Sequence, residues 1–536
     1  MQQYRDHAIR DTHVNVHHGL DDLNLDDVLY AADVGLKPTK KCLDGTRMEI
    51  LQEIDDWVHD VDVNAPRIFW LHGQAGKGKS AIAHTIALQA KDRGELGSCF
   101  CFARDRQSEH REEKMFTTIA RDLADQDPTF RRALSRIFAN NRSLMATPDI
   151  IQQWEKLLLA PLSQVASGIV GRIVVVIDAL DESGLELSRS HILSALGSPP
   201  AAKLPSNFRL LITSRLLPDI QIGLSSARHV KAVSLDDVPF AFTERDIRLF
   251  VSMKIGDLED IGENEVNQIA QKADGLFEWA RLACEFIGLN ATGELVKERF
   301  NSCIGRASGE GNVLLDSMYR AILESVVSVR PTAVMRFRSV MRQVLHTLEP
   351  LPVDGLNVMR QHFSHKHSGF NVVIVLYFMS PLLSGVTDHI VAVRPLHASF
   401  YEFLTDPLRS GEYFVDEVDI QAELAIAALL VLHGGLFFNI CRLESSYLPN
   451  SEVPDMAERV KANIPSHLSY SCCFWAKHLH ATRFDPVLAG YVRDLLGSEK
   501  ILFWFEAMSL LGVLGNAAAA LAYAVRWLQV SRSLMQ

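Results

Sequence analysis

A glycine-rich stretch early in the chain has the residue types and the spacing that bind phosphate. Residues 73–80 read GQAGKGKS and match the pattern G-x-x-x-x-G-K-[ST]. Glycines allow successive backbone N–H groups to curve around a phosphate without steric conflict from Cβ atoms. Lys79 is expected to reach the β- and γ-phosphates of a nucleotide, and the hydroxyl of Ser80 is expected to hold Mg²⁺.

The residues around this stretch provide the setting that a phosphate loop needs. An apolar block, IFWLH, precedes it, and an alanine-rich helical pattern follows over residues 79–91. A helix that begins at the loop directs the positive end of its dipole at the bound phosphate. We therefore predict a nucleotide-binding set made of Gly73, Gly76, Gly78, Lys79, Ser80 and Ala81.

An acidic group follows a second apolar block. Residues 174–182 read VVVIDALDE, so Asp178 ends the block and Asp181 and Glu182 begin the next loop. A carboxylate at the position of Asp178 can accept from a magnesium-bound water beside Ser80. Either Asp181 or Glu182 could orient an attacking water, and the sequence does not choose between them.

A third polar cluster ends another apolar block. Residues 210–215 read LLITSR, so Thr213, Ser214 and Arg215 close a predicted strand. The carboxyl ends of strands line the ligand crevice of parallel sheets. Arg215 is therefore our candidate for a sensor of the γ-phosphate.

These clusters need a sheet to bring them together. Short apolar blocks at residues 67–72, 98–103, 171–180, 208–215 and 228–235 alternate with helical patterns. Continuous apolar strands separated by helices are typical of a parallel sheet that is covered on both faces. The sequence therefore predicts an α/β domain with all three clusters at one edge.

The remainder of the chain is predicted to be mostly helical. A polar, partly ordered leader is expected over residues 1–40, before an α/β domain over residues 41–235. After that domain we expect a helical domain at 236–330, a small winged-helix-like domain at 331–410, and an all-helical domain at 411–536.

Composition excludes some functions. The net charge of −11 argues against a general nucleic-acid binder, which usually has a basic face. Residues 501–525 are apolar, but Glu506 and Asn516 interrupt them and glycines break them, so we expect a buried helix pair and no membrane span. The eight cysteines are scattered without the C-x-x-C spacing of zinc sites, which indicates reduced thiols in a cytoplasmic protein.

The motifs, in this order, resemble those of the NACHT class of STAND P-loop NTPases. More narrowly, the chain is similar to fungal proteins whose nucleotide domain is nephrocystin-like. The resemblance extends to HASFYEF at residues 397–403. It implies a cytoplasmic signalling switch that is closed with ADP and oligomerises with ATP and Mg²⁺, with unidentified protein partners.

The resemblance also implies roles for particular residues. In related proteins a histidine in the motif at residues 397–403 touches bound ADP, which makes His397 a candidate latch. The alternative is a core histidine beside Phe400 and Phe403. Residues 45–47, which read GTR, are expected near the adenine, and residues 236–330 correspond to a helical lid.

The sequence departs from the family pattern at one motif and leaves other functions open. The G-L-P of the lid reads Gly275-Leu276-Phe277 here, so the proline expected to pack on adenine is missing. QKAD at residues 271–274 imitates a guanine-reading motif but lies in a helical pattern. The main alternative to a switch that hydrolyses ATP slowly is a scaffold that holds nucleotide without hydrolysing it.

Overall fold

The computed structural model describes most of the chain as two compact units. One unit is Met1–Gly288 with Leu295–Leu315, and the other is Leu289–Glu294 with Asp316–Gln536. Most of the leader expected over residues 1–40 lies outside the described residues. The residues described are 28, 30–31, 35–103, 111–165, 171–184, 186–288, 295–305, 311–327, 330–363, 370–445 and 447–534.

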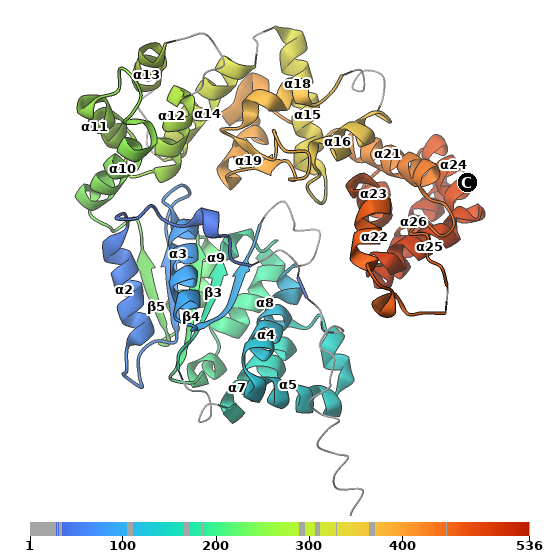
Figure 1. Cartoon of the computed structure of the whole chain (residues 1–536), viewed down its shortest axis with the longest axis horizontal. Coiled ribbons are helices and arrows are strands. Elements are labelled where there is room, and N and C mark those ends of the chain that lie inside the picture. The colour runs from blue at the N-terminus through green and yellow to red at the C-terminus, as the bar shows by residue number, and fades with distance from the viewer. Residues whose placement is uncertain are drawn as a thin grey trace, which may run out of the picture. The chain divides into compact units, whose positions relative to one another are not determined.

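The first unit contains the predicted parallel sheet (Figure 1). Its order is β2-β3-β4-β1-β5, and every neighbouring pair is parallel. All five predicted strands are present, although the second begins two residues earlier than expected. The strands are β1 (Ile68–His72), β2 (Leu96–Cys101), β3 (Ile173–Asp178), β4 (Phe208–Ser214) and β5 (Val230–Ser234).

The position of β4 between β1 and β3 decides which strand ends meet. His72 of β1 is the register partner of Ser214 in β4. Ile177 of β3 is the partner of Ile212 in β4. The phosphate loop after β1 and the acids after β3 therefore lie on either side of the polar end of β4.

Helices cover both faces of the sheet, as predicted (Figure 1). Alternate residues of a strand point to opposite faces, so Phe69 and Leu71 pack against α2 (Met48–His59) and α3 (Lys79–Asp92). Trp70 faces the other layer. The elements of that layer include α4 (Met115–Gln126), α5 (Pro128–Asn140), α6 (Ile150–Gln152), a π-helix (Gln153–Leu159), α7 (Ala160–Val165), α8 (Glu186–Leu196) and α9 (Pro218–Ser225).

The rest of the first unit is helical, as the sequence predicts. Its helices follow β5. They are α10 (Phe240–Ile255), α11 (Glu263–Lys272), α12 (Phe277–Gly288), α13 (Val296–Gly305) and the beginning of α14 (Asn312–Val326). The first residues of one of them, α12, contact the phosphate loop through Glu278 and Gly76.

The second unit begins within α14 and has two parts. The first part joins helices to a short antiparallel pair of strands, β6 (Leu383–Ser384) and β7 (Arg394–Pro395). Its helices are α15 (Pro331–His346), α16 (Val353–Arg360), α18 (Val373–Leu376), α19 (Ala398–Leu404) and α20 (Pro407–Ser410).

The second part of this unit consists of helices packed on helices. The predicted break near Gly512 separates two of them, and none of the helices within the described residues is long and apolar enough to cross a membrane. They are α21 (Ile420–Gly435), α22 (Met456–Asn463), α23 (Ser466–His480), α24 (Pro486–Gly497), α25 (Lys500–Leu510) and α26 (Ala517–Leu534).

Candidate phosphate-binding site

The predicted phosphate loop joins β1 to α3. Gly76 has φ +81°, and a Cβ atom there would lie 3.1 Å from the Cβ of Glu278 at the start of α12. The backbone N–H of Glu278 donates to the carbonyl of Gly76 over 3.1 Å. Gly78 has φ +89° and leads directly into α3. Both positions therefore need glycine, one for close packing and both for a left-handed backbone.

The ammonium group of Lys79 is held by the loop itself. Its Nζ donates to the carbonyls of Gly73 at 2.7 Å and Gln74 at 2.8 Å. Its pKa is lowered, chiefly because the surrounding protein penalises the charged form, while the nearby carboxylate of Asp181 acts in the opposite direction. An ammonium group has three N–H donors, and loop carbonyls accept two of them here. These two hydrogen bonds hold the ammonium group of Lys79 against the loop.

Ser80 and Ala81 form the next part of the predicted site. Both lie in the first turn of α3 and are half-buried. The hydroxyl of Ser80 and the carboxylate of Asp178 are hard oxygen ligands of the kind that Mg²⁺ prefers. The chemistry of this donor set therefore fits the ion that the motif implies.

The carboxylate of Asp178 is fixed by its neighbour on β4. Thr213 Oγ1 donates to Asp178 Oδ1 over 2.5 Å and accepts from the backbone N–H of Ala179 over 3.0 Å. Asp178 is only 4% exposed. Ala179 then turns the chain with a left-handed backbone, φ +58°, which is unfavourable for a residue with a Cβ atom. The turn directs Asp181 back toward the end of β4.

Asp181, one of the two acids predicted to orient the attacking water, forms an ion pair with Arg215, the predicted sensor. Arg215 Nε lies 2.6 Å from Asp181 Oδ2, and the backbone N–H of Arg215 donates to Oδ1 over 3.0 Å. Both carboxylate oxygens of Asp181 therefore have donors from one residue. Glu182 lies on the same 3₁₀ turn, Leu180–Glu182, and is half-buried.

Asp236 also contacts the loop, although it was not among the residues predicted from the sequence. It follows β5, and its carboxylate accepts from the backbone N–H of Gln74 at 3.2 and 3.3 Å. Its Oδ1 lies 3.8 Å from Nζ of Lys77. The signal was an acid directly after a predicted strand, the same signal that identified Asp178.

Arg47, from the GTR stretch, joins three parts of the first unit. Its Nη2 donates to the carbonyl of Lys77 over 2.6 Å, and its backbone N–H donates to Asp246 Oδ2 of α10 over 2.9 Å. Its guanidinium lies 4.6 Å from the ring centroid of Phe277, the residue found in place of the lid proline. A cation above an aromatic face is attractive, so Phe277 has a packing partner at this position.

A cavity of about 270 Å³ adjoins Arg47, between α2, the end of β5 and the start of α10. It is lined by Arg47, Glu49, Ile50, Glu53, Val233, Ser234, Asp237, Val238, Pro239, Phe242 and Asp246. Acidic side chains and apolar surface meet in it. A planar base with an exocyclic amino group could pack its rings against the apolar surface and donate hydrogen bonds to the acidic side chains.

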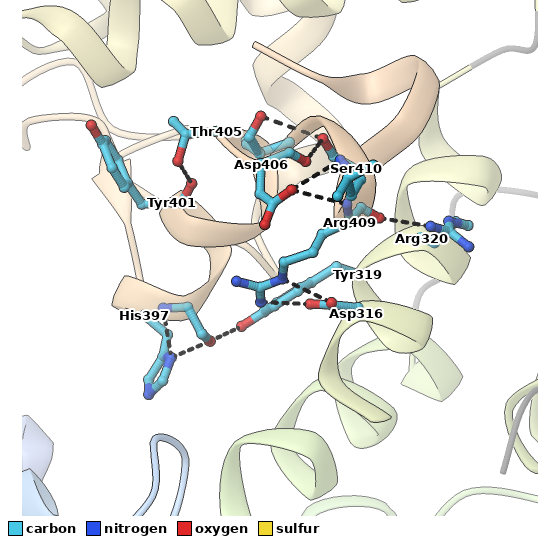
Figure 2. A network of polar contacts seen from close by, with 12 residues as sticks. Asp316, Tyr319, Arg320, His397, Tyr401, Thr405, Asp406, Arg409 and Ser410 are labelled. Atoms are coloured by element: carbon cyan, nitrogen blue, oxygen red, sulfur yellow. Dashed lines mark hydrogen bonds and ion pairs between the residues drawn. The ribbon is translucent and has the colours of Figure 1, made fainter. Parts of the chain in front are cut away.

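His397 belongs to the second unit, where it caps α19 (Figure 2). Its Nδ1 accepts from the backbone N–H of Ser399 over 3.2 Å and lies 2.6 Å from Ser399 Oγ, which in turn lies 2.6 Å from the hydroxyl of Tyr319. A backbone N–H can only donate, so a neutral His397 ring carries its proton on Nε2. The neighbours Phe400 and Phe403 are buried, whereas His397 is half-buried.

Helix α14, which carries Tyr319, is also joined to α20 by an ion pair. Arg409 reaches Asp316 of α14 through Nε at 2.9 Å and Nη2 at 2.7 Å, and Arg320 Nη2 donates to the carbonyl of Arg409 over 2.7 Å (Figure 2). A two-pronged arginine–carboxylate contact holds orientation as well as distance. These contacts therefore hold α14 and α20 together.

Together, the fold and the first-unit site define a class of protein domain. A glycine-rich loop between a parallel strand and a helix, with an acid at the end of a strand two positions away, is the arrangement of a P-loop NTPase domain. Residues 45–215 match the family model described as nephrocystin 3, N-terminal. This part of the chain is therefore similar to that family of domains.

Three solved structures are similar to parts of the chain. A STAND protein with a tetratricopeptide repeat sensor, PH0952 from Pyrococcus horikoshii, has a TM-score of 0.39 at 14% identity, covering 95% of this chain and 66% of its own. The Walker-type ATPase PABY2304 of Pyrococcus abyssi gives 0.32 at 12% identity, covering 71% and 98%. PCH-2 of C. elegans gives 0.26 at 12%, covering 49% and 68%. No curated protein matches the chain.

The role of Thr213 in holding Asp178 can be tested by an isosteric change. Thr213→Val removes the hydroxyl, so we expect the free energy of unfolding to fall by about 1–3 kcal/mol as a buried acceptor and a buried donor lose their partner. Thr213→Ser keeps the hydroxyl and loses one methyl group, at about 1 kcal/mol. Urea unfolding followed by circular dichroism measures both. Equal losses in the two variants would show that the hydroxyl is not what stabilises the turn.

Proposed function

We propose that the protein is an adenine-nucleotide switch. It binds ATP or ADP with Mg²⁺, hydrolyses ATP slowly, and couples the γ-phosphate to domain opening and oligomerisation. The observation that carries this proposal is the ion pair between Arg215 and Asp181 at the edge of the site. A γ-phosphate offers Arg215 an additional anionic partner that ADP does not provide. A contact made in only one nucleotide state is what shifts a conformational equilibrium.

The proposed phosphate and metal roles follow from the donors at the loop. Backbone groups of Gly73, Gly76 and Gly78, the ammonium of Lys79, and the first turn of α3 at Ala81 would surround the phosphates. Ser80 and Asp178 would hold Mg²⁺, which neutralises charge on the β- and γ-phosphates when it is bound. Thr213 contributes by holding Oδ1 of Asp178 through a hydrogen bond. The other oxygen of Asp178, Oδ2, is not bound by Thr213.

The two acids after β3 take different roles in this proposal. Asp181 has both oxygens engaged by Arg215, so its role is to position the sensor. Glu182 is the other acid on this turn, and we assign the attacking water to it. This assignment chooses between two residues that the sequence alone left equivalent.

The adenine is proposed to occupy the cavity beside Arg47. Arg47 links that cavity to the loop through the carbonyl of Lys77, so a base in the cavity and phosphates in the loop would be parts of one ligand. At about 270 Å³ the cavity is near the lower end of ligand pockets, which start at roughly 300 Å³. Its acidic lining suits an amino group.

The second unit is proposed to read the nucleotide through His397. The ring tautomer described above offers an N–H donor at Nε2, which suits the β-phosphate of ADP in a closed state. Residues 236–330 would act as the lid of a NACHT-type protein, residues 331–410 as a winged helix with β6 and β7 as its wing, and residues 411–536 as a helical partner surface. The compartment we propose is the cytoplasm.

A second candidate function is a scaffold that holds nucleotide without hydrolysing it. The observation in its favour is again the Asp181 carboxylate, whose two oxygens are both occupied by Arg215. If Glu182 does not act on water, no other acid on this turn is available to do so. The two candidates differ in turnover and agree on binding.

Replacing Lys79 tests nucleotide binding, and Lys77 provides a matched control in the same loop. Lys79→Ala should weaken binding of a fluorescent ATP analogue by about a hundredfold, because a charge-assisted contact contributes roughly 1.5–3 kcal/mol. Lys77 pairs with Asp236 on the outside of the loop, so Lys77→Ala should cost less than about tenfold. Fluorescence titration with Mg²⁺ measures both affinities. Unchanged binding in Lys79→Ala would remove the basis for a nucleotide function.

Single-turnover hydrolysis separates the switch from the scaffold. Glu182→Gln should slow ATP cleavage by about 10²–10⁴-fold without changing ATP affinity, as expected for loss of a group that handles the water proton. Asp181→Asn should instead reduce the preference for ATP over ADP, since it releases Arg215. A wild-type protein that binds ATP but cleaves none over hours, with neither variant different, would favour the scaffold.

The latch role of His397 predicts faster loss of ADP. His397→Leu should raise the ADP dissociation rate about tenfold, since it removes one hydrogen bond to a charged group. It should also increase the oligomer fraction seen by light scattering. His389, an exposed histidine of the same unit, provides the control, and His389→Leu should change neither quantity. An unchanged dissociation rate in His397→Leu would leave His397 as a helix cap alone.

A further inference from the structure

Three metal-binding side chains that the proposed mechanism does not use lie together in the first unit. Cys99 and Cys101 come from β2, and His84 comes from α3. The two Sγ atoms are 4.0 Å apart, Cys101 Sγ lies 3.8 Å from His84 Nε2, and all three ligand atoms lie within 4.8 Å of one another. All three side chains are buried.

The fold explains why these residues converge. Cys99 and Cys101 are two apart on one strand, so both point to the face of the sheet that α3 covers. His84 follows Ser80 by four residues, one turn further along α3. Cys101 is the register partner of Asp178 on β3, and Asp178 Oδ2 lies 4.0 Å from His84 Nε2. Asp178 therefore borders the three-residue cluster at His84, and a shift of its side chain would bring it in as a fourth ligand.

The spacing is close to that of a tetrahedral metal site. Zinc binds sulfur at about 2.3 Å and histidine nitrogen at about 2.0–2.1 Å, which places neighbouring ligand atoms about 3.5–3.8 Å apart. The observed separations of 3.8 and 4.0 Å differ from these by a few tenths of an ångström. Two sulfurs and an imidazole favour a soft or borderline cation over Mg²⁺.

We propose that His84, Cys99 and Cys101, with Asp178 as fourth ligand, form a binding site for Zn²⁺ or a similar thiophilic divalent cation. We further propose that metal bound there withdraws Asp178 from Mg²⁺ and so weakens Mg²⁺-dependent nucleotide binding, a step that rests on the function proposed above. Thr213 holds the other oxygen of Asp178, so one carboxylate cannot serve both cations fully.

Binding requires a defined exchange of protons. The backbone N–H of Lys37 donates to His84 Nδ1 over 3.3 Å, so without metal the neutral ring carries its proton on Nε2. Metal binding would release to solvent whatever thiol protons Cys99 and Cys101 carry, move the ring proton of His84 from Nε2 to Nδ1, and break the bond from Lys37. Losing one such bond lowers affinity by about tenfold, which is small against the many orders of magnitude by which thiolate sites hold zinc.

Cobalt serves as the probe, because Co²⁺ replaces Zn²⁺ in tetrahedral sites and absorbs visible light. The full, nucleotide-free chain is titrated with Co²⁺ in a thiol-free reductant. We expect one Co²⁺ per chain, with a thiolate-to-cobalt charge-transfer band that added Zn²⁺ abolishes. Absence of that band in the wild-type chain would overturn the site.

Variants locate the probe within the chain. Cys101→Ser and Cys99→Ser should each reduce Co²⁺ affinity by about a hundredfold, while Cys473→Ser, at a half-buried cysteine of the second unit, should not change it. Circular dichroism checks that each variant is folded, and these near-isosteric changes preserve volume. A charge-transfer band that persists in the Cys99→Ser, Cys101→Ser double variant would place the metal elsewhere and overturn the assignment.

The proposed effect of the bound metal on nucleotide binding is measured in a separate experiment. With free Zn²⁺ set by a chelator buffer, the wild-type chain should bind the fluorescent ATP analogue with Mg²⁺ at least about tenfold more weakly, and the double variant should be insensitive to Zn²⁺. Equal sensitivity in both, or none in either, would overturn the coupling. If the chain binds no nucleotide at all, the proposed function fails, while the cobalt spectrum still decides the metal site.

Discussion

The buried carboxylate of Asp178 is the group on which the candidate site depends. A charge removed from water requires hydrogen-bond partners from the protein, and Thr213 provides one at 2.5 Å. Thr213 can do so only because β4 lies between the strand that leads into the phosphate loop and the strand that ends in Asp178. The same strand end continues into Arg215, which holds Asp181. The strand order therefore sets both the metal ligand and the sensor.

The groups around the loop share one physical feature, which is that each cation already has a partner within the protein. Lys79 donates to two loop carbonyls, Arg215 is paired with Asp181, and Arg47 caps the carbonyl of Lys77. An anionic ligand would have to replace these protein partners of the cations when it binds. The free-energy cost of each replacement then sets how strongly the site prefers one nucleotide state over another. On its other side Asp178 faces His84, so hard and soft ligand sets meet at one carboxylate.

Much of the fold was predictable because it rests on local patterns. The five apolar blocks became five parallel strands. Only β2 was displaced, by two residues, because its apolar run continues beyond the ladder into Phe102. The phosphate loop was predictable for a different reason, because its residues are consecutive in the chain and each has a defined role in binding phosphate or Mg²⁺.

By itself, then, the sequence determined the sheet, its covered faces, the phosphate loop and the polar strand ends, because periodicity and consecutive motifs are properties of neighbouring residues. Only the tertiary structure decided that Asp181 is bound by Arg215 and that Asp236 closes the outside of the loop. It also decided that His84 meets two cysteines, although the absence of C-x-x-C pairs had indicated no zinc site. These contacts join strands and helices far apart in the chain, and their partners are selected by strand order and register, which no local pattern specifies.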